Sequence, residues 1–143
     1  VLQENMSLSL RYGNIFSVII IDIDFFKKIN DNFGHQVGDD VLKECSYILS
    51  QNIRNVDTLG RWGGEEFLVV CPETLKDGAK DLAIKLNKAI KLHKFSTYPH
   101  SVTISVGVAS CSVNDLNYDD IISNADKALY EAKNNGRDRV EIF

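Results

Sequence analysis

A continuous apolar run near the N-terminus limits the possible folds more than any other feature of this sequence. Residues 15–23 read Ile-Phe-Ser-Val-Ile-Ile-Ile-Asp-Ile, which is rich in β-branched side chains and too short for a typical helix. A strand that is apolar at nearly every position is covered on both faces, so we expect it in the middle of a sheet. It ends in Asp22 and Asp24, which the two-residue period of a strand places on one side. We expect Asp24 to cap a short helix at residues 25–32.

The rest of the chain alternates between helical and strand patterns. Residues 1–13 resemble the end of a helix, with Leu2, Met6 and Leu10 at fourfold spacing. A polar loop is expected at residues 30–40. The further predicted helices begin at Asp39 or Asp40, at Thr74 or Asp77, and at Asn117, the last ending at Gly136; the further strands are 58–62, 67–71, 101–109 and 140–143. In the strand 101–109, Thr103 and Ser105 are expected to point outward. This order predicts an α/β (α+β) sandwich with a mixed sheet.

Composition and charge narrow the class of protein. The 143 residues are 44% hydrophobic, which suits one globular domain spanning residues 1–143. The net charge of −4 argues against a nucleic-acid polymer as partner. Without a long apolar run or a signal peptide, and with three scattered cysteines, we expect a cytoplasmic domain with reduced thiols. Because the chain begins at Val1, we also expect an N-terminally truncated fragment of a longer signalling protein, whose membrane anchoring stays open.

A glycine pair followed by two acids lies between two strand-like runs. The stretch Arg61–Phe67 reads Arg-Trp-Gly-Gly-Glu-Glu-Phe, which predicts a tight hairpin with Gly63 and Gly64 at positive φ. A bare glycine tip lets a ligand approach the backbone closely. The two acids that follow the tip, Glu65 and Glu66, are expected on opposite faces of the strand.

The acids of the hairpin and of the first strand suggest a metal site. If the two strands are neighbours, three carboxylates converge, and hard oxygen ligands suit Mg²⁺ or Mn²⁺ together with substrate phosphates. The start of the helix after Asp24 offers backbone N–H groups to an anion, and Lys27 lies in its first turn. Lys133 and Arg137, four residues apart at a helix end, either hold phosphates or complement the helix dipole.

Together these residues resemble the GGDEF domain family, the diguanylate cyclases. The resemblance runs in family order over residues 15–143. The matching pieces are Ile21-Asp22-Ile23-Asp24-Phe25-Phe26-Lys27, Asn30-Asp31-Asn32-Phe33-Gly34-His35, Gly38-Asp39, Arg61-Trp62-Gly63-Gly64-Glu65-Glu66-Phe67, Ser105-Val106-Gly107, Ala128-Leu129-Tyr130-Glu131-Ala132-Lys133 and Gly136-Arg137. One departure is that the family's opening Asp-x-Leu-Thr-Gly-Leu-x-Asn-Arg segment is absent.

The resemblance implies a fold, a reaction and a set of roles. The fold would be a five-stranded mixed sheet flanked by helices and carrying the hairpin, similar to the adenylyl-cyclase and polymerase palm. The reaction would join two GTP molecules into cyclic di-GMP and release two pyrophosphates. The implied roles are Mg²⁺ binding by Asp22, the Ile23 carbonyl and Glu65, general base catalysis by Glu65, charge stabilisation by Lys27, guanine recognition by Asn30 and Asp39, further substrate contacts from Phe26 and His35, and phosphate binding by Lys133 and Arg137.

The resemblance also implies how such a domain would be regulated. Because one domain binds one GTP, catalysis needs a transient antiparallel homodimer, controlled by an upstream sensory domain. Arg54 and Asp57 fit the family's Arg-x-x-Asp site, at which cyclic di-GMP inhibits its own synthesis; a surface ion pair is the alternative. The alternative for the whole chain is a catalytically silent GGDEF module that binds GTP or cyclic di-GMP and signals through a partner.

Overall fold

The computed structural model describes residues 2–4, 6, 15–111 and 117–143. The elements in chain order are β1 (Phe16–Ile23), α2 (Phe26–Phe33), α3 (His35–Asn52), β2 (Thr58–Arg61), β3 (Glu66–Pro72), α4 (Lys76–Leu92), β4 (Ile104–Ser110), α5 (Tyr118–Asn134) and β5 (Arg139–Ile142). This is the predicted order of strands and helices. The described residues 2–4 and 6 are helical, as expected, whereas Leu10 lies outside the described residues.

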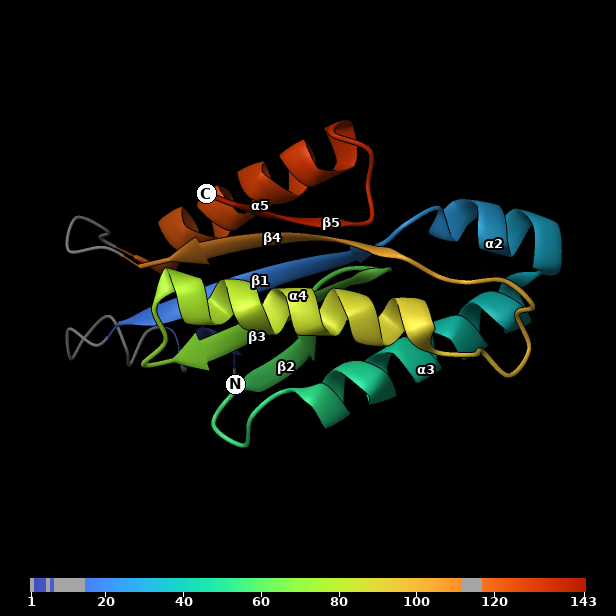
Figure 1. Ribbon diagram of the computed structural model, residues 1–143, viewed down its shortest axis with the longest axis horizontal. Helices are drawn as coiled ribbons and strands as arrows, with labels where there is room; N and C mark the ends of the chain where they lie inside the picture. The colour runs from blue at the N-terminus through green and yellow to red at the C-terminus, as the bar shows by residue number, and fades with distance from the viewer. Residues whose placement is uncertain (1, 5, 7–14, 112–116) are drawn as a thin grey trace.

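The five strands form one mixed sheet in the order β2-β3-β1-β4-β5, with β1 in the centre as predicted (Figure 1). Every residue of β1 is buried. Its two neighbours run antiparallel to it, and β5 runs parallel to β4. The predicted fold class, a mixed sheet flanked by helices, is therefore confirmed. No helix within the described residues combines the length and the apolar character that a membrane crossing requires.

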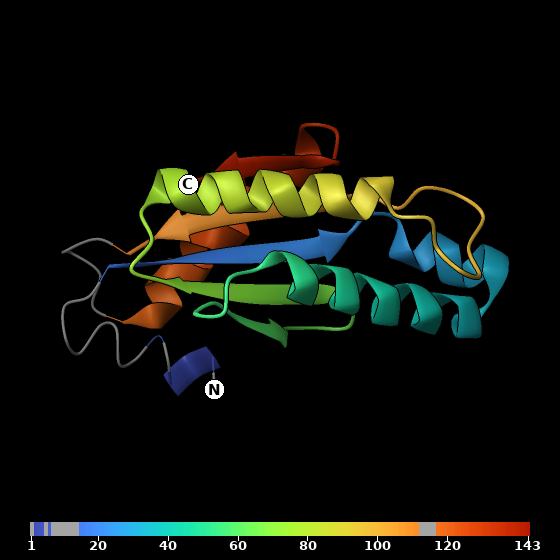
Figure 2. The ribbon, with the colours of Figure 1, turned by 60° about the horizontal axis from the view of Figure 1, so that its bottom comes forward.

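Helices cover both faces of the sheet (Figures 1 and 2). On one face, Ile19 and Ile21 of β1 belong to a core cluster with Leu49 of α3 and Leu86 of α4. On the other face, the alternating residues of β1 pack with α5 in a second cluster, Val18 and Ile20 against Ile121 and Leu129. Because strand side chains alternate, the even-numbered residues at the end of β1 also face α5.

The predicted loop at residues 30–40 is wrong. The helix α2 continues to Phe33 and α3 begins at His35, so a single residue, Gly34, separates them. Gly34 has φ 92, and its amide donates to the carbonyl of Asn30 at 2.8 Å. A glycine in this conformation turns the chain in one residue. The polar residues that suggested a loop are mostly the exposed sides of two helices.

The predicted two-residue hairpin turn is also wrong. Residues 62–65 join β2 to β3, and neither Gly63 nor Gly64 has positive φ. The amide of Trp62 donates to the carbonyl of Glu66 at 2.8 Å, which closes the connection. The guanidinium of Arg61 donates to the Gly63 carbonyl at 3.5 Å and to the Gly64 carbonyl at 2.5 Å. Backbone bonds to the Glu66 carbonyl and side-chain bonds from Arg61, rather than a primed turn, hold this loop.

Both ends of α5 match the sequence pattern. The side chain of Asn117 accepts a hydrogen bond from the amide of Asp120 at 3.2 Å, as a helix cap does. Gly136 has φ 119 just beyond the helix, as expected for a residue that ends one.

In its middle, α5 lies directly on β4. A Cβ atom built at Gly107 would lie 2.2 Å from the Ala125 carbonyl oxygen and 2.5 Å from the Leu129 amide nitrogen.

We predict that Gly107→Ala destabilises the protein, because the added methyl group collides with helix backbone that has no rotamer to change. Overpacking of this kind costs about 1–3 kcal/mol. Chemical denaturation followed by circular dichroism measures the change in the free energy of unfolding. Gly64→Ala is the matched control, since a Cβ built there meets nothing within 4 Å. Equal unfolding midpoints for the two variants would contradict the close contact.

Candidate active site

Acidic side chains from two neighbouring strands meet at one end of the sheet. Asp22 of β1 is directly opposite Glu66 of β3 and Ser105 of β4. Residues opposite each other on antiparallel strands carry their side chains on the same face. Asp22 is 5% exposed, and its Oδ2 accepts a hydrogen bond from Nζ of Lys133 at 2.5 Å. The buried carboxylate is thus compensated by a cation at the end of α5.

Glu65 lies at the same end of the sheet. Its carbonyl accepts a hydrogen bond from the amide of Ile23 at 3.3 Å, which ties the hairpin to the end of β1. Burial raises the pKa of Glu65 and of Glu66, and the negative charge of Asp22 raises both further, while Lys133 acts in the opposite direction. Both acids of the hairpin, rather than one, therefore sense the charges around Asp22.

The expected cluster of three carboxylates around one metal ion is not assembled. Among the residues that the structure describes, no three side chains of His, Cys, Asp or Glu are grouped so that they could hold a metal ion. The smaller set of Asp22, Glu65 and the Ile23 carbonyl still suits Mg²⁺, which commonly takes one or two carboxylates and completes its shell with water and phosphate oxygens. The repulsion between Asp22 and Glu65 is relieved by a cation, so this donor set fits a divalent metal.

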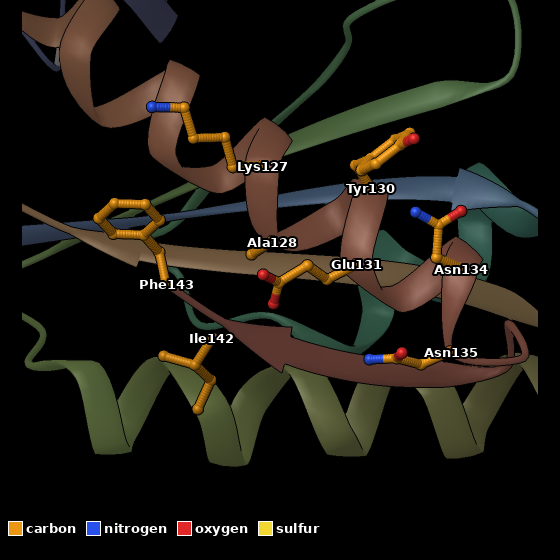
Figure 3. A pocket seen from close by; sticks show the side chains of 8 residues that line it. All are labelled: Lys127, Ala128, Tyr130, Glu131, Asn134, Asn135, Ile142 and Phe143. Carbon is orange, nitrogen blue, oxygen red and sulfur yellow. The ribbon is translucent and has the colours of Figure 1, made fainter.

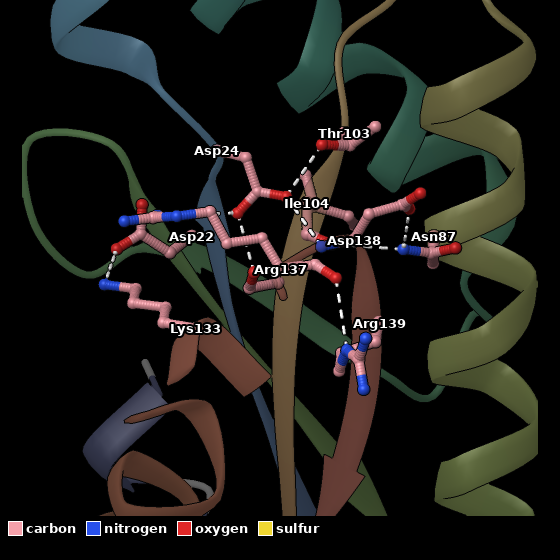
Figure 4. A network of polar contacts seen from close by, with 10 residues as sticks. Asp22, Asp24, Asn87, Thr103, Ile104, Lys133, Arg137, Asp138 and Arg139 are labelled. Atoms are coloured by element: carbon pink, nitrogen blue, oxygen red, sulfur yellow. Dashed lines mark hydrogen bonds and ion pairs between the residues drawn. The ribbon is translucent and has the colours of Figure 1, made fainter. Parts of the chain in front are cut away.

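Asp24 does not cap α2, contrary to expectation. Phe25 occupies the cap position with φ 57, and no side chain caps the helix. The Asp24 carboxylate instead accepts hydrogen bonds from the hydroxyls of Thr103 at 2.7 Å and Ser105 at 2.6 Å, and from the amide of Asp138 at 3.0 Å (Figure 4). Ser105 is fully buried and Thr103 is half-buried, so the outward orientation predicted for them is wrong. The hydroxyls of Thr103 and Ser105, two residues apart in the otherwise apolar predicted strand 101–109, were the sequence feature that could have indicated a buried acid as their partner.

The residues expected to contact a nucleotide base lie on α2 and α3. Phe26 is buried, and Asn30 lies against α3 at Gly38, where a built Cβ would be 1.7 Å from the Asn30 Oδ1 atom. The structure therefore brings Phe26, Asn30 and Gly38 together. Three more of the predicted residues, Lys27, His35 and Asp39, lie on exposed positions of the same two helices.

Lys133 in the last turn of α5 and Arg137 just beyond it each contact an acid at or just after the end of β1. Lys133 pairs with Asp22, and Nη1 of Arg137 lies 3.9 Å from Oδ1 of Asp24. The sequence left two roles open for this pair, phosphate binding and complementing the helix dipole. The contacts with Asp22 and Asp24 belong to neither role. Both cations lie beside the acids that end the central strand, as Figure 4 shows.

Arg54 and Asp57 form an ion pair at the opposite end of β3 from Glu66. Nε and Nη2 of Arg54 donate to the two carboxylate oxygens of Asp57 at 3.1 and 2.8 Å. The Asp57 side chain is fully buried, while the Arg54 side chain is 52% exposed. Burial, with the nearby Asp57 charge, raises the pKa of the Cys71 thiol to about 12. The ion-pair alternative is therefore present, and the arginine is reachable from solvent.

The three cysteines are thiols, and all lie within the described residues. Cys45 and Cys71 are buried, as expected, and burial raises the pKa of Cys45 to about 12. Cys111 is only half-buried, and its sulfur accepts a hydrogen bond from the amide of Phe16 at 3.2 Å.

A pocket of about 740 Å³ lies between α5 and β5 (Figure 3). Its lining comprises Lys127, Ala128, Tyr130, Glu131, Asn134, Asn135, Ile142 and Phe143. None of these is among the residues predicted for the site. The pocket is therefore separate from the acids at the end of β1, and we assign no role in the chemistry to it.

Comparison with known proteins identifies close relatives of this architecture. A family model described as "Diguanylate cyclase, GGDEF domain" matches residues 1–139. Diguanylate cyclase A of Treponema denticola is 44% identical over 128 residues, which are 88% of this chain and 34% of that protein. The chain thus spans about a third of the length of this curated relative.

Solved structures give the same result. The active GGEEF domain of a diguanylate cyclase from Vibrio cholerae superposes with a TM-score of 0.92 at 36% identity, covering 99% of this chain and 90% of that one. The GGDEF domain of DgcB from Caulobacter crescentus, solved in complex with c-di-GMP, has a TM-score of 0.91 at 25% identity, covering 99% and 85%.

Proposed function

Because this chain belongs to the GGDEF domain family of diguanylate cyclases, we propose that it condenses two GTP molecules into cyclic di-GMP and releases two pyrophosphates. One observation carries the proposal: Asp22 and Glu65 lie at the end of the central strand beside Lys133. Carboxylates next to cations suit a metal ion and a triphosphate together. A silent binding module, the alternative, does not need this acid pair.

Asp22, Glu65 and the Ile23 carbonyl would hold the divalent ion, Mg²⁺ or Mn²⁺. When bound, this ion supplies positive charge to the phosphates and favours ionisation of the attacking hydroxyl. Lys133 then exchanges its Asp22 partner for a phosphate oxygen, and Arg137 binds the same terminal phosphates. Lys27, exposed on the first turn of α2, would face the charge that builds on the transferred phosphate.

Glu65 would accept the proton of the ribose 3′-hydroxyl as that oxygen attacks the partner's α-phosphate. The bond from the α-phosphate to the bridging oxygen then breaks, and pyrophosphate leaves. Burial and the charge of Asp22 raise the pKa of Glu65, whereas a divalent ion held by its carboxylate would lower it.

Guanine would be read by the side chains of Asn30 and Asp39. A carboxylate accepts hydrogen bonds from the two neighbouring donors on the guanine edge, N1 and N2, and adenine lacks that pair. Phe26 and His35 would line the same region. Each domain holds one GTP, so the two 3′-hydroxyls attack across a transient antiparallel homodimer. An upstream sensory domain would set how often two domains meet.

We predict that Glu65→Gln abolishes synthesis and leaves the fold intact, because a carboxamide neither accepts the proton nor carries the charge that holds the metal. Incubation with GTP and Mg²⁺ at high protein concentration, followed by mass detection of cyclic di-GMP, measures the rate. We expect a loss of at least about 100-fold. Glu131→Gln, an exposed acid on α5, is the matched control. Binding of GTP without product by the unaltered chain would favour the silent module.

We predict that Asp39→Ser weakens the preference for GTP over ATP, because serine offers one hydrogen-bond acceptor site where the carboxylate offers two oxygens. Competition between the two nucleotides in a binding assay gives the ratio of their dissociation constants. This ratio should fall about tenfold or more. Asp40→Ser is the neighbouring control. Unchanged selectivity would remove Asp39 from guanine recognition.

Product inhibition through Arg54 and Asp57 belongs to the same proposal. In the structure the guanidinium already has an acidic partner, so binding of cyclic di-GMP would add contacts from its exposed side or replace the Asp57 pair. The solved complex of the DgcB domain with c-di-GMP supports the general ability of this fold to bind the product.

We predict that Arg54→Ala relieves product inhibition, raising the half-inhibitory concentration of cyclic di-GMP about tenfold or more. The same change leaves the buried Asp57 carboxylate without its main partner, which costs about 1–3 kcal/mol of stability. Inhibition curves are therefore compared below the unfolding temperature of the variant. Arg139→Ala, an exposed arginine of β5, is the control. An unaltered inhibition curve would sink this assignment.

A further inference from the structure

The turn that carries Arg137 has an unusual backbone. Gly136, Arg137 and Asp138 have φ of 119, 63 and 46, three consecutive residues in the left-handed region. Residues other than glycine adopt this region only at an energetic cost, and they remain there when the surrounding structure fixes them. Since two of the three carry side chains, contacts outside the turn must hold it.

Asp24 holds the turn from the side of the sheet. Its side chain has no exposed surface, and its Oδ2 accepts a hydrogen bond from the Asp138 amide at 3.0 Å. On the other side, the Asp138 carboxylate accepts a hydrogen bond from Asn87 at 3.2 Å (Figure 4). It also pairs with Lys91 at 2.6 Å. The turn is therefore fixed between β1 and α4, and the backbone position of Arg137 follows from it.

Phe25 contacts the guanidinium of Arg137 itself. It directly follows Asp24, has φ 57 and is 51% exposed. A half-exposed aromatic residue in a strained conformation gains little from core packing. Its ring centroid lies 4.7 Å from Cζ of Arg137, within the range of a cation–π contact. With Asp24 Oδ1 at 3.9 Å from Nη1, the guanidinium is held by an acid and an aromatic ring.

Lys28 makes a second cation contact with the same ring, since its Nζ lies 4.9 Å from the Phe25 centroid. The Phe25 ring, just before α2, therefore contacts two cations, Lys28 from α2 and Arg137 from the turn after α5. The repulsion between two positive charges is offset where an anion or a π face attracts both of them. Phe25 supplies that face, and the nucleotide phosphates of the proposed function would supply the anion.

We propose that Phe25 is a positioning residue, which orders the Arg137 guanidinium for the terminal phosphates of the bound nucleotide. The proposal rests on the proposed function, in which Arg137 binds those phosphates. An arginine side chain has many rotamers, so an ordered guanidinium loses less conformational entropy when the phosphate binds. The strained φ of Phe25 sets its ring beside Arg137.

The experiment compares two nucleotides that differ only in phosphate number. The probes are 3′-deoxy-GTP and 3′-deoxy-GMP with Mg²⁺, because loss of the 3′-hydroxyl prevents turnover. Calorimetry measures both dissociation constants for the unaltered chain, for Phe25→Leu, Phe25→Tyr and Arg137→Ala, and for the double variant Phe25→Leu with Arg137→Ala. Phe25→Gly is added because glycine adopts φ 57 without strain, so this variant folds even if leucine is poorly tolerated.

We expect Phe25→Leu and Phe25→Gly to weaken triphosphate binding about threefold and to leave monophosphate binding unchanged. Phe25→Tyr, which keeps the ring, should bind as the unaltered chain does. In the Arg137→Ala background, Phe25→Leu should have no further effect, because the group that it positions is gone.

Three results would overturn the proposal, each for a different reason. Equal weakening of both nucleotides would mean that Phe25 only supports the fold. Full additivity with Arg137→Ala would mean that the two side chains act independently. If Arg137→Ala itself leaves triphosphate binding unchanged, the phosphate role of Arg137 in the proposed function fails, and the role of Phe25 fails with it.

Discussion

Buried negative charge at the end of the central strand determines how the rest of this structure is arranged. Asp22 and Asp24 close a strand that is buried along its whole length, where an ion is costly unless it is paired and hydrogen-bonded. Lys133 from α5 compensates the first acid. The hydroxyls of Ser105 in β4 and of Thr103 just before it, with the amide of Asp138, compensate the second. The compensating groups come from segments far apart in sequence, so the site is complete only when these segments are packed together.

The close packing of α5 is what brings Lys133 to Asp22. Gly107 has no Cβ, so the helix backbone lies directly on β4 and the last turn of α5 reaches the end of β1. The same helix then leads into the left-handed turn that carries Arg137. In the proposed reaction these two cations exchange protein acids for phosphates. Each cation then keeps a negatively charged partner throughout.

The sequence predicted the site better at the strands than at the connections. The apolar runs and the two-residue period predicted the strands β1 and β3 and the acids at their ends, whereas the register that places Asp22 opposite Glu66 came from the structure. The turns were predicted wrongly for two reasons. At residues 62–65, a longer connection takes the place of the predicted two-residue turn, and backbone bonds to Glu66 with side-chain bonds from Arg61 close it without positive φ at the glycines. At Gly34, a single residue makes the turn between α2 and α3 for which the polar residues 30–40 had suggested a loop.

The sequence by itself determined the family, the order of the elements and the central place of β1, because periodicity and motif spacing are local properties of the chain. Only the tertiary structure decided what each acid does. Asp22 and Asp24 are two residues apart with the same strand pattern. One faces a lysine, and the other accepts hydrogen bonds from two hydroxyls and from the amide of a turn. That difference depends on which side chains of β4 and α5 reach each carboxylate, and partners more than 75 residues away leave no local sign.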